Sequence, residues 1–202
     1  ATGIACHVGK MDQLAILVSE TIAKYGQIDI LVNNAATNPT FGPIHDTTLD
    51  AFDKIMNVNL KAPFELMRLC LPHLQKSSNA SVINISSVGG ISPEPGLGIY
   101  SVSKAALISM TKAFAKEWGD FNIRVNAICP GFLDTEMTDQ SIRIISEKTG
   151  RSTAQAKAAL EGLNPQGRLF APSEVTAAAL YLCSEGAQGV NGQSIVIAGG
   201  EV

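Results

Sequence analysis

The stretch Ile28-Asp29-Ile30-Leu31-Val32-Asn33-Asn34-Ala35-Ala36 decides the fold. It begins as a run rich in β-forming residues, which is typical of a strand buried on both faces, and ends in two asparagines before a Pro/Gly loop. Helical patterns separate such runs along the chain. We therefore predict an α/β fold, a doubly wound parallel sheet with helices on both faces. The further strands are expected at 2–8, 81–86, 123–128 and 194–197.

Apolar spacing and capping residues predict the helices between these strands. The pattern over 11–25 ends at Gly26, and Thr47 or Thr48 caps a helix that runs to about residue 76. A loop rich in glycine and proline leads into the helix that carries Tyr100. Residues 132–165 are expected to be loop and a short amphipathic helix, and Ser173 is expected to cap a helix to about Cys183. The whole chain, 1–202, is predicted to be one domain.

Composition excludes several classes of function. The chain has 202 residues, 46% hydrophobic and 16% charged, which indicates a globular protein and not a disordered one. A net charge of −3 provides no basic footprint for nucleic acid. No apolar run reaches the ~18 residues that a membrane span needs. We therefore expect no nucleic-acid partner and no membrane partner.

The cysteines and histidines do not form a recognisable metal motif. There are four cysteines and three histidines, and no two cysteines form a CxxC pair. Reduced thiols in a cytoplasmic protein are the expected interpretation, and we predict no metal site.

Polar and glycine residues lie at the ends of several predicted strands at once. Asn33-Asn34 follows one strand, Ser86-Ser87 the next, and Pro130-Gly131 the third. In open α/β sheets ligands bind outside the carboxyl ends of the strands. The sequence therefore predicts a functional site at this edge of the sheet.

Tyr100 and Lys104 are the strongest catalytic candidates. They are four residues apart and so share one helix face. A tyrosine has a pKa near ~10, and a nearby ammonium group favours the phenolate and lowers that pKa. The pair could therefore exchange a proton near neutral pH. The alternative is a half-buried helix tyrosine beside a solvated lysine.

Two further residues can complete such a site. Ser87, thirteen residues before Tyr100, can donate a hydrogen bond to a carbonyl oxygen. Asn59 lies four residues before Pro63, which has no N–H, so the Asn59 carbonyl loses its helical partner and can hold a water. The alternatives are a strand-end turn serine and a kink needed only for packing.

Together these motifs resemble the short-chain dehydrogenase/reductase family. The match covers essentially the whole chain. Some segments look most like its NADP-dependent carbonyl or retinal reductases, whereas residues 132–165 look more like hydroxyacyl or cyclic-alcohol dehydrogenases. The motifs that carry the family resemblance are Asn33-Asn34-Ala35-Ala36, Asn59, Ser87, Tyr100 with Lys104, and Pro130-Gly131-Phe132-Leu133-Asp134-Thr135.

The resemblance implies a Rossmann-like fold, an NADP or NAD cofactor and a role for each residue. Tyr100 would be the general acid and base, and Lys104 would lower its pKa and bind the nicotinamide ribose. Ser87 would polarise the substrate carbonyl, and the Asn59 carbonyl would hold a relay water. The further cofactor contacts implied are Asn33, Ala35, Pro130, Gly131 and Thr135.

The chain departs from the family at its beginning. The family's glycine-rich loop TGxxxGIG is not in this sequence, which lacks two βα units, roughly fifty to sixty residues, relative to the family. Residues 2–8 correspond to the third strand and 28–33 to the fourth. The third strand then has no neighbour, and the fourth exposes an unpaired edge.

These observations favour an NAD(P)-dependent oxidoreductase that interconverts a hydrophobic ketone or aldehyde and its alcohol. Residues 89–99 and the lid segment 132–165 are expected to wall the pocket. A 3-ketoacyl thioester reductase or 3-hydroxyacyl dehydrogenase is the alternative, because Arg143, Lys148 and Arg151 could form a basic rim. A second alternative is a non-catalytic relative that cannot bind cofactor. Apolar residues on more than one face of the Tyr100 helix predict a homo-oligomer, a tetramer by family resemblance.

Overall fold

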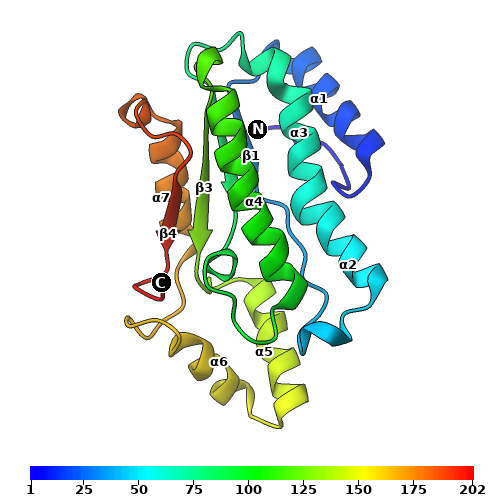
Figure 1. Cartoon of the computed structure of the whole chain (residues 1–202), viewed down its shortest axis with the longest axis vertical. Coiled ribbons are helices and arrows are strands. Elements are labelled where there is room, and N and C mark those ends of the chain that lie inside the picture. The colour runs from blue at the N-terminus through cyan, green and yellow to red at the C-terminus, as the bar shows by residue number, and fades with distance from the viewer.

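A computed structural model describes all residues, 1–202, and shows a parallel sheet with helices on both faces (Figure 1). The sheet has four strands in the order β1-β2-β3-β4, all parallel. The strands are β1 (Ile30–Asn33), β2 (Ser81–Ile85), β3 (Arg124–Pro130) and β4 (Ser194–Ile197). This arrangement confirms the predicted fold class and four of the five predicted strands.

The two faces of the sheet are covered by different helices. Helices α3 (Ala62–Leu74) and α4 (Gly98–Glu117) contact the central strands on one face, and α1 (Met11–Tyr25) packs outside α3. Helix α7 (Pro172–Cys183) covers the other face, and Figure 1 shows it on the opposite side of β3 from α4. The predicted bounds of α1, ending at Gly26, are confirmed.

The core follows from the alternation of side chains along the strands. Val82 of β2 packs in the cluster beneath α3 and α4, whereas Ile83, the next residue, packs beneath α7. Val125 and Ile128 of β3 divide between the same two clusters. All four side chains have no exposed surface, so the central strands bury apolar side chains on both faces, as the sequence pattern predicts.

The prediction of a strand over residues 2–8 is wrong. The segment is extended but irregular, and the first helix follows it at Met11. A strand needs a partner for its backbone hydrogen bonds, and no strand of this chain lies beside the segment. The predicted free edge is confirmed: β1 pairs with β2 alone, and Ile30 and Val32 are about half exposed.

The predicted continuous helix from Thr48 to about residue 76 is interrupted. Thr48 caps α2 (Leu49–Met56) by accepting the Ala51 N–H, which confirms one of the two candidate caps. A π-helical turn, η2 (Asn57–Lys61), then precedes α3. Pro63 lies just inside α3 and cannot donate to the carbonyl four residues before it, so the hydrogen-bond ladder changes period at this point.

Residues 132–165 contain two helices, not one short one. These are α5 (Glu136–Thr149) and α6 (Thr153–Glu161), and both lie beyond the carboxyl ends of the strands (Figure 1). Ser152 forms a capping box with Gln155 that starts α6. Short 3₁₀ turns complete the fold at η1 (Ile44–Asp46), η3 (Val88–Gly90), η4 (Gly119–Phe121) and η5 (Glu185–Ala187).

The predicted cap of α7 at Ser173 is also wrong. The helix begins at Pro172 with Ala171 as N-cap, and the Glu174 carboxylate accepts the Ala171 N–H at 2.8 Å. Proline suits the first helical position because its φ is already helical and its missing N–H would have no partner there.

No helix of the chain has the length and apolarity needed to cross a membrane. No group of three or more His, Cys, Asp or Glu side chains is placed to hold a metal ion.

Candidate active site

A cavity of about 300 Å³ opens at the carboxyl ends of β2 and β3, beneath α5. Ser86-Ser87 follows β2 and Pro130-Gly131 lies at the end of β3, as predicted from the sequence. The sheet register sets these ends side by side, because Ile85 pairs with Ile128 and Pro130 with Ile197. Six of the predicted site residues line this one cavity: Ser87, Tyr100, Lys104, Pro130, Gly131 and Thr135.

Ser87 is fixed by the turn that follows β2. Its backbone is extended, and its Oγ accepts the Gly89 N–H at 3.1 Å, which starts η3. The hydroxyl proton therefore remains available to donate toward the cavity. Hydrogen bonding from this hydroxyl acts to lower the pKa of Tyr100. The two hydroxyls thus face the same small volume.

Tyr100 and Lys104 lie one turn apart on α4, as predicted. The Lys104 Nζ lies 5.7 Å from the centroid of the Tyr100 ring. Burial raises the pKa of Tyr100, and the hydrogen bond from Ser87 opposes that rise. The Lys104 ammonium donates to a backbone carbonyl, and its predicted lowering of the Tyr100 pKa stays a prediction.

Two hydrogen bonds, one from Lys104 and one from Ser86, join α4 to the end of β2. The Lys104 Nζ donates to the Ile85 carbonyl at 2.7 Å, and the Ser86 hydroxyl donates to the Lys104 carbonyl at 2.9 Å. Lys104 is 2% exposed. Burial lowers its pKa to about 8, and the neighbouring Cys129 acts in the opposite direction. An ammonium group with one fixed acceptor keeps two further donors for a ligand.

Asn59 does not line the cavity but holds the residues around it. Its side-chain amide accepts the Thr37 N–H at 2.8 Å and donates to the Thr37 carbonyl at 3.0 Å. The same amide donates to the Ser103 hydroxyl, which donates to the Tyr100 carbonyl at 2.7 Å. The prediction concerned the Asn59 backbone carbonyl. The structure adds a side-chain clamp between η2, the loop after β1 and the first turns of α4.

Asn33 and Ala35 lie near the cavity without lining it. Asn33 is 6% exposed and its amide donates to the Asn84 Oδ1 of β2 at 2.8 Å, so it joins two strands. Asn34 and Ala36, the residues next to them, line the cavity instead. Successive residues leaving a strand point to opposite sides, so Asn34 and Ala36 face this cavity, and the cofactor contacts of Asn33 and Ala35 stay a prediction.

The predicted walls of the cavity are confirmed in outline. Gly89 and Leu97 come from the loop before Tyr100, and Phe132, Met137 and Ser141 from the lid segment. The lid also has a small core of its own, so it folds back on itself as well as over the cavity. That core consists of Ile142, Ile145, Ala156 and Leu160.

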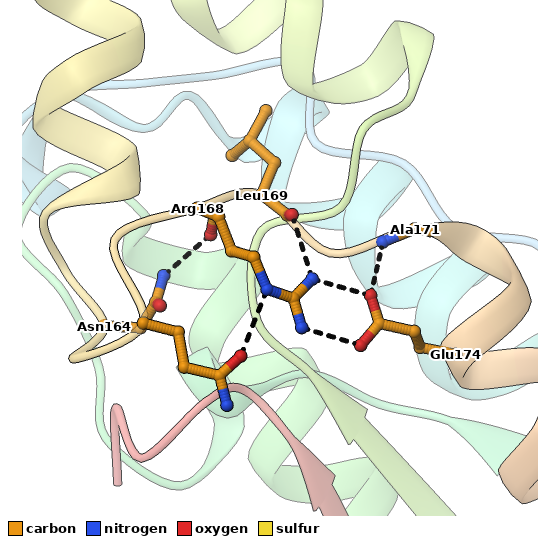
Figure 2. A network of polar contacts seen from close by, with 6 residues as sticks. Asn164, Arg168, Leu169, Ala171 and Glu174 are labelled. Carbon is orange, nitrogen blue, oxygen red and sulfur yellow. Dashed lines mark hydrogen bonds and ion pairs between the residues drawn. The ribbon is translucent and has the colours of Figure 1, made fainter.

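A polar network anchors the end of the lid segment (Figure 2). The Arg168 guanidinium forms two hydrogen bonds to the Glu174 carboxylate, at 2.7 and 2.9 Å, and Glu174 also accepts the Ala171 N–H. The Asn164 amide donates to the Arg168 carbonyl at 2.9 Å. The segment between α6 and α7 is thereby held against the start of α7, which fixes one end of the lid.

The predicted basic rim is not part of the cavity. Arg143 is exposed, and Lys148 donates to the Phe41 carbonyl. The charged side chains on the lining, apart from Lys104, are instead Glu94 and Glu201. Sequence reasoning missed Glu201, although it follows β4 and two glycines, and the strand-end rule that found Ser87 applies to it equally.

The sheet and cavity define an open, parallel α/β protein whose ligand site lies at the carboxyl ends of its strands. The family model described as Enoyl-(Acyl carrier protein) reductase matches residues 1–201. Human Dehydrogenase/reductase SDR family member 4 is 37% identical over 98% of this chain and 68% of its own length. The chain belongs to the short-chain dehydrogenase/reductase family of oxidoreductases.

Solved structures agree with this assignment. A variant of the actinorhodin polyketide ketoreductase with NADPH has a TM-score of 0.92 and 30% identity, over 98% of this chain and 76% of its own. ElxO with NADP bound has a TM-score of 0.87 and 28% identity, over 99% of this chain and 77% of its own. These two structures therefore share the fold of this chain over nearly its whole length.

Proposed function

We propose that the protein is an NAD(P)-dependent oxidoreductase that interconverts a hydrophobic ketone or aldehyde and the corresponding alcohol. One observation carries the proposal: Ser87, Tyr100 and Lys104 converge on one cavity at the ends of β2 and β3. Hydroxyl, phenol and ammonium donors gathered around one small volume suit an oxygen atom that gains negative charge during reaction. A mostly apolar lining with a few fixed polar groups suits an uncharged carbonyl group.

Each residue has a role in moving or holding a proton. Tyr100 donates its phenolic proton to the carbonyl oxygen in reduction and accepts it back in oxidation. Burial raises the pKa of Tyr100, and the hydrogen bond from Ser87 acts against this rise, which favours release of the phenolic proton. Ser87 donates a hydrogen bond to the same oxygen. Asn59 and Ser103 position the turn of α4 that carries Tyr100.

The residues present fit the nicotinamide half of an NADP or NAD cofactor. Lys104 has unused donors for the ribose hydroxyls, and the backbone after β3 at Pro130 and Gly131, with Thr135, lines the same cavity. The neighbouring structures solved with NADPH and NADP support the same cofactor class. When bound, the cofactor supplies or accepts a hydride at the substrate carbon.

The test is turnover by the parent protein and the variant Tyr100→Phe with NADPH and NADH on cyclic and aryl ketones. The variant keeps the ring and removes the exchangeable proton, so turnover should fall by about 10²–10⁴-fold. Circular dichroism should be unchanged, and a thermal shift with each cofactor should persist. Near-parental turnover of a folded variant would overturn the assignment. A complete lack of cofactor binding by the parent would instead favour a non-catalytic role.

A second candidate is a 3-ketoacyl thioester reductase or 3-hydroxyacyl dehydrogenase. The family model's description and the polyketide ketoreductase neighbour favour it. The cavity argues against it, because the proposed basic residues lie off the lining and two carboxylates lie on it. A clear preference in kcat/KM for a β-ketoacyl thioester, lost when Arg143 and Lys148 are neutralised, would promote this candidate.

We also propose that the protein is a homo-oligomer, as a tetramer by family resemblance. The observation in support is apolar surface on neighbouring helices: Phe64 of α3 is 44% exposed and Val102 of α4 is 46% exposed. A helix–helix contact between subunits would cover both. Light scattering at micromolar concentration that gives only a monomer mass would contradict this proposal.

A further inference from the structure

The cavity has an acidic end that the proposed reaction does not use. Glu94, from the loop between η3 and α4, and Glu201, four residues past the end of β4, both line it. No arginine lines the cavity, and the lining lysine, Lys104, already donates to the Ile85 carbonyl. Two carboxylates therefore lie at one end of a mostly apolar cavity, and no positively charged side chain of the lining pairs with them.

The backbone around Glu201 is built to hold this carboxylate in place. Gly199 and Gly200 have φ of +59° and +89°, a conformation that favours glycine, and the Glu201 N–H donates to the Ala198 carbonyl at 3.1 Å. A Cβ at Gly131 would lie 2.9 Å from the Glu201 Oε2. Three glycines thus turn the chain back over the end of β3 and leave room for the carboxylate.

The Glu201 carboxylate has an unsatisfied oxygen. Its Oε2 is buried and has no hydrogen-bond partner in the protein. Burial raises the pKa of Glu201, and the negative charge of Glu94 raises it further. A buried acceptor without a donor is unfavourable, and so are two like charges in a mostly apolar cavity. A ligand that brings both a donor and a positive charge would relieve both effects.

We propose that Glu201 and Glu94 bind the ammonium group of an amino-ketone or amino-alcohol substrate. The inference rests on the proposed function for the reaction at the carbonyl, which it places at the Ser87 and Tyr100 end of the cavity. The apolar body of the substrate lies between, against Leu97 and Phe132. A neutral hydroxyl would satisfy the free oxygen but leave the repulsion between the carboxylates, so the geometry and charge favour a cation.

The experiment compares two ketones of the same shape, 4-(dimethylamino)cyclohexanone and 4-isopropylcyclohexanone. The ratio of their kcat/KM values, amine over isostere, is measured at pH 7 for the parent protein, Glu201→Gln, Glu94→Gln and Glu136→Gln. Glu136 is the matched control, because it is an exposed carboxylate on the first turn of α5 that does not line the cavity. Calorimetric binding of both ketones is measured on the same proteins.

The parent should prefer the amine, and Glu201→Gln should lower that preference by about tenfold, the scale of one hydrogen bond to a charged group. Glu94→Gln should lower it less, and Glu136→Gln should leave it unchanged. Turnover of the isostere without any preference for the amine, or an equal loss in Glu136→Gln, would overturn the inference while the proposed function stands. Binding of the amine that depends on Glu201, without turnover of either ketone, would support the inference while the proposed function fails.

Discussion

The floor and the roof of the cavity are built in different ways. The floor, formed by the ends of β2 and β3 with η3 and the first turns of α4, is held by buried and partly buried hydrogen bonds between side chains and backbone. The roof, formed by α5 with α6 packed against it, has its own small apolar core and is anchored by the Arg168–Glu174 pair near the surface. The floor belongs to the main packing of the domain, whereas the roof is attached to it.

This difference suggests that the floor carries the proton transfer and that the roof controls which substrates bind. Proton transfer requires donors fixed to within fractions of an ångström, which a floor held by side chain–backbone hydrogen bonds can provide. A roof with a separate core can shift or vary without disturbing those donors. We therefore expect changes in the floor to reduce kcat strongly, and changes at the anchor of the roof to act mainly on KM.

Among the variants that test this comparison, the largest effect is expected from a change in the floor, Gly90→Ala. A Cβ at Gly90 would lie 2.7 Å from the Lys104 carbonyl carbon and 2.9 Å from the Ala105 nitrogen, and backbone cannot move aside easily. Overpacking of this kind costs about 1–3 kcal/mol, and small displacements of catalytic groups can cost about a hundredfold in rate. Thermal denaturation and kcat measure both consequences.

Gly119→Ala is the matched control, because a Cβ there meets nothing within 4 Å. It should leave both stability and kcat close to the parental values. Equal behaviour of the two variants would mean that the close contact between η3 and α4 does not position the floor.

The second prediction concerns pH and the ammonium of Lys104. Its pKa is lowered to about 8, so kcat/KM for reduction should fall above pH of about 8 as the ammonium is lost. Stability should change in the opposite direction. Between pH 8 and the ordinary value of 10.5 the unfolded chain holds a proton that the folded chain has released, so the free energy of unfolding rises with pH.

Rate profiles and denaturant melts over the same pH range test this pair of trends. A folded Lys104→Arg variant keeps its positive charge at these pH values and should lose the alkaline decline. The same decline in both proteins would assign it to another group.

The sequence predicted the elements whose signals are local. The alternation of apolar runs predicted β4 at its observed bounds, and Gly26 predicted the end of α1. The segment 2–8 has strand-forming residues as well, but a strand depends on a partner elsewhere in the chain. The π-helical turn at η2 likewise depends on how Pro63 is accommodated, which residue types alone do not specify.

The same distinction applies to the site. Ser87, Tyr100 and Lys104 follow from strand ends and helical spacing, and they line one cavity. The side-chain clamp of Asn59 on Thr37 and Ser103 joins residues 22 and 44 positions away, so only the fold reveals it. The partner of Lys104 is a backbone carbonyl, and such acceptors carry no sequence signal.

A smaller effect is expected from Pro63→Ala, at the border between η2 and α3. Alanine supplies a backbone N–H that can donate to the Asn59 carbonyl. Pro63 has no N–H and cannot make this hydrogen bond. If that carbonyl takes part in a water relay, kcat should fall by a few-fold with little change in KM. The Asn59 side-chain contacts should persist. A variant with unaffected or faster turnover would contradict the relay.

The smallest effect is expected from the roof anchor, in the variant Glu174→Gln. The Arg168 side chain lowers the pKa of Glu174 to about 2, with help from the Ala171 N–H. The contribution of the carboxylate to stability is therefore complete above the ordinary value of 4.5 and is lost as the pH falls toward 2. Because both side chains are partly exposed, the change in melting temperature should be small, while a looser lid raises KM a few-fold.

Glu161→Gln is the control for this last prediction, because it removes a longer ion pair, 3.8 Å from Lys157, within α6. It changes the same charge on the same roof without touching the anchor, and KM should stay near the parental value. The difference in stability between the parent and Glu174→Gln should vanish near pH 2. A KM that rises equally in both variants would show that charge on the roof matters and that the anchor does not. Unequal effects on kcat, with KM unchanged, would mean that the anchor acts on the floor and that the two parts are not separable.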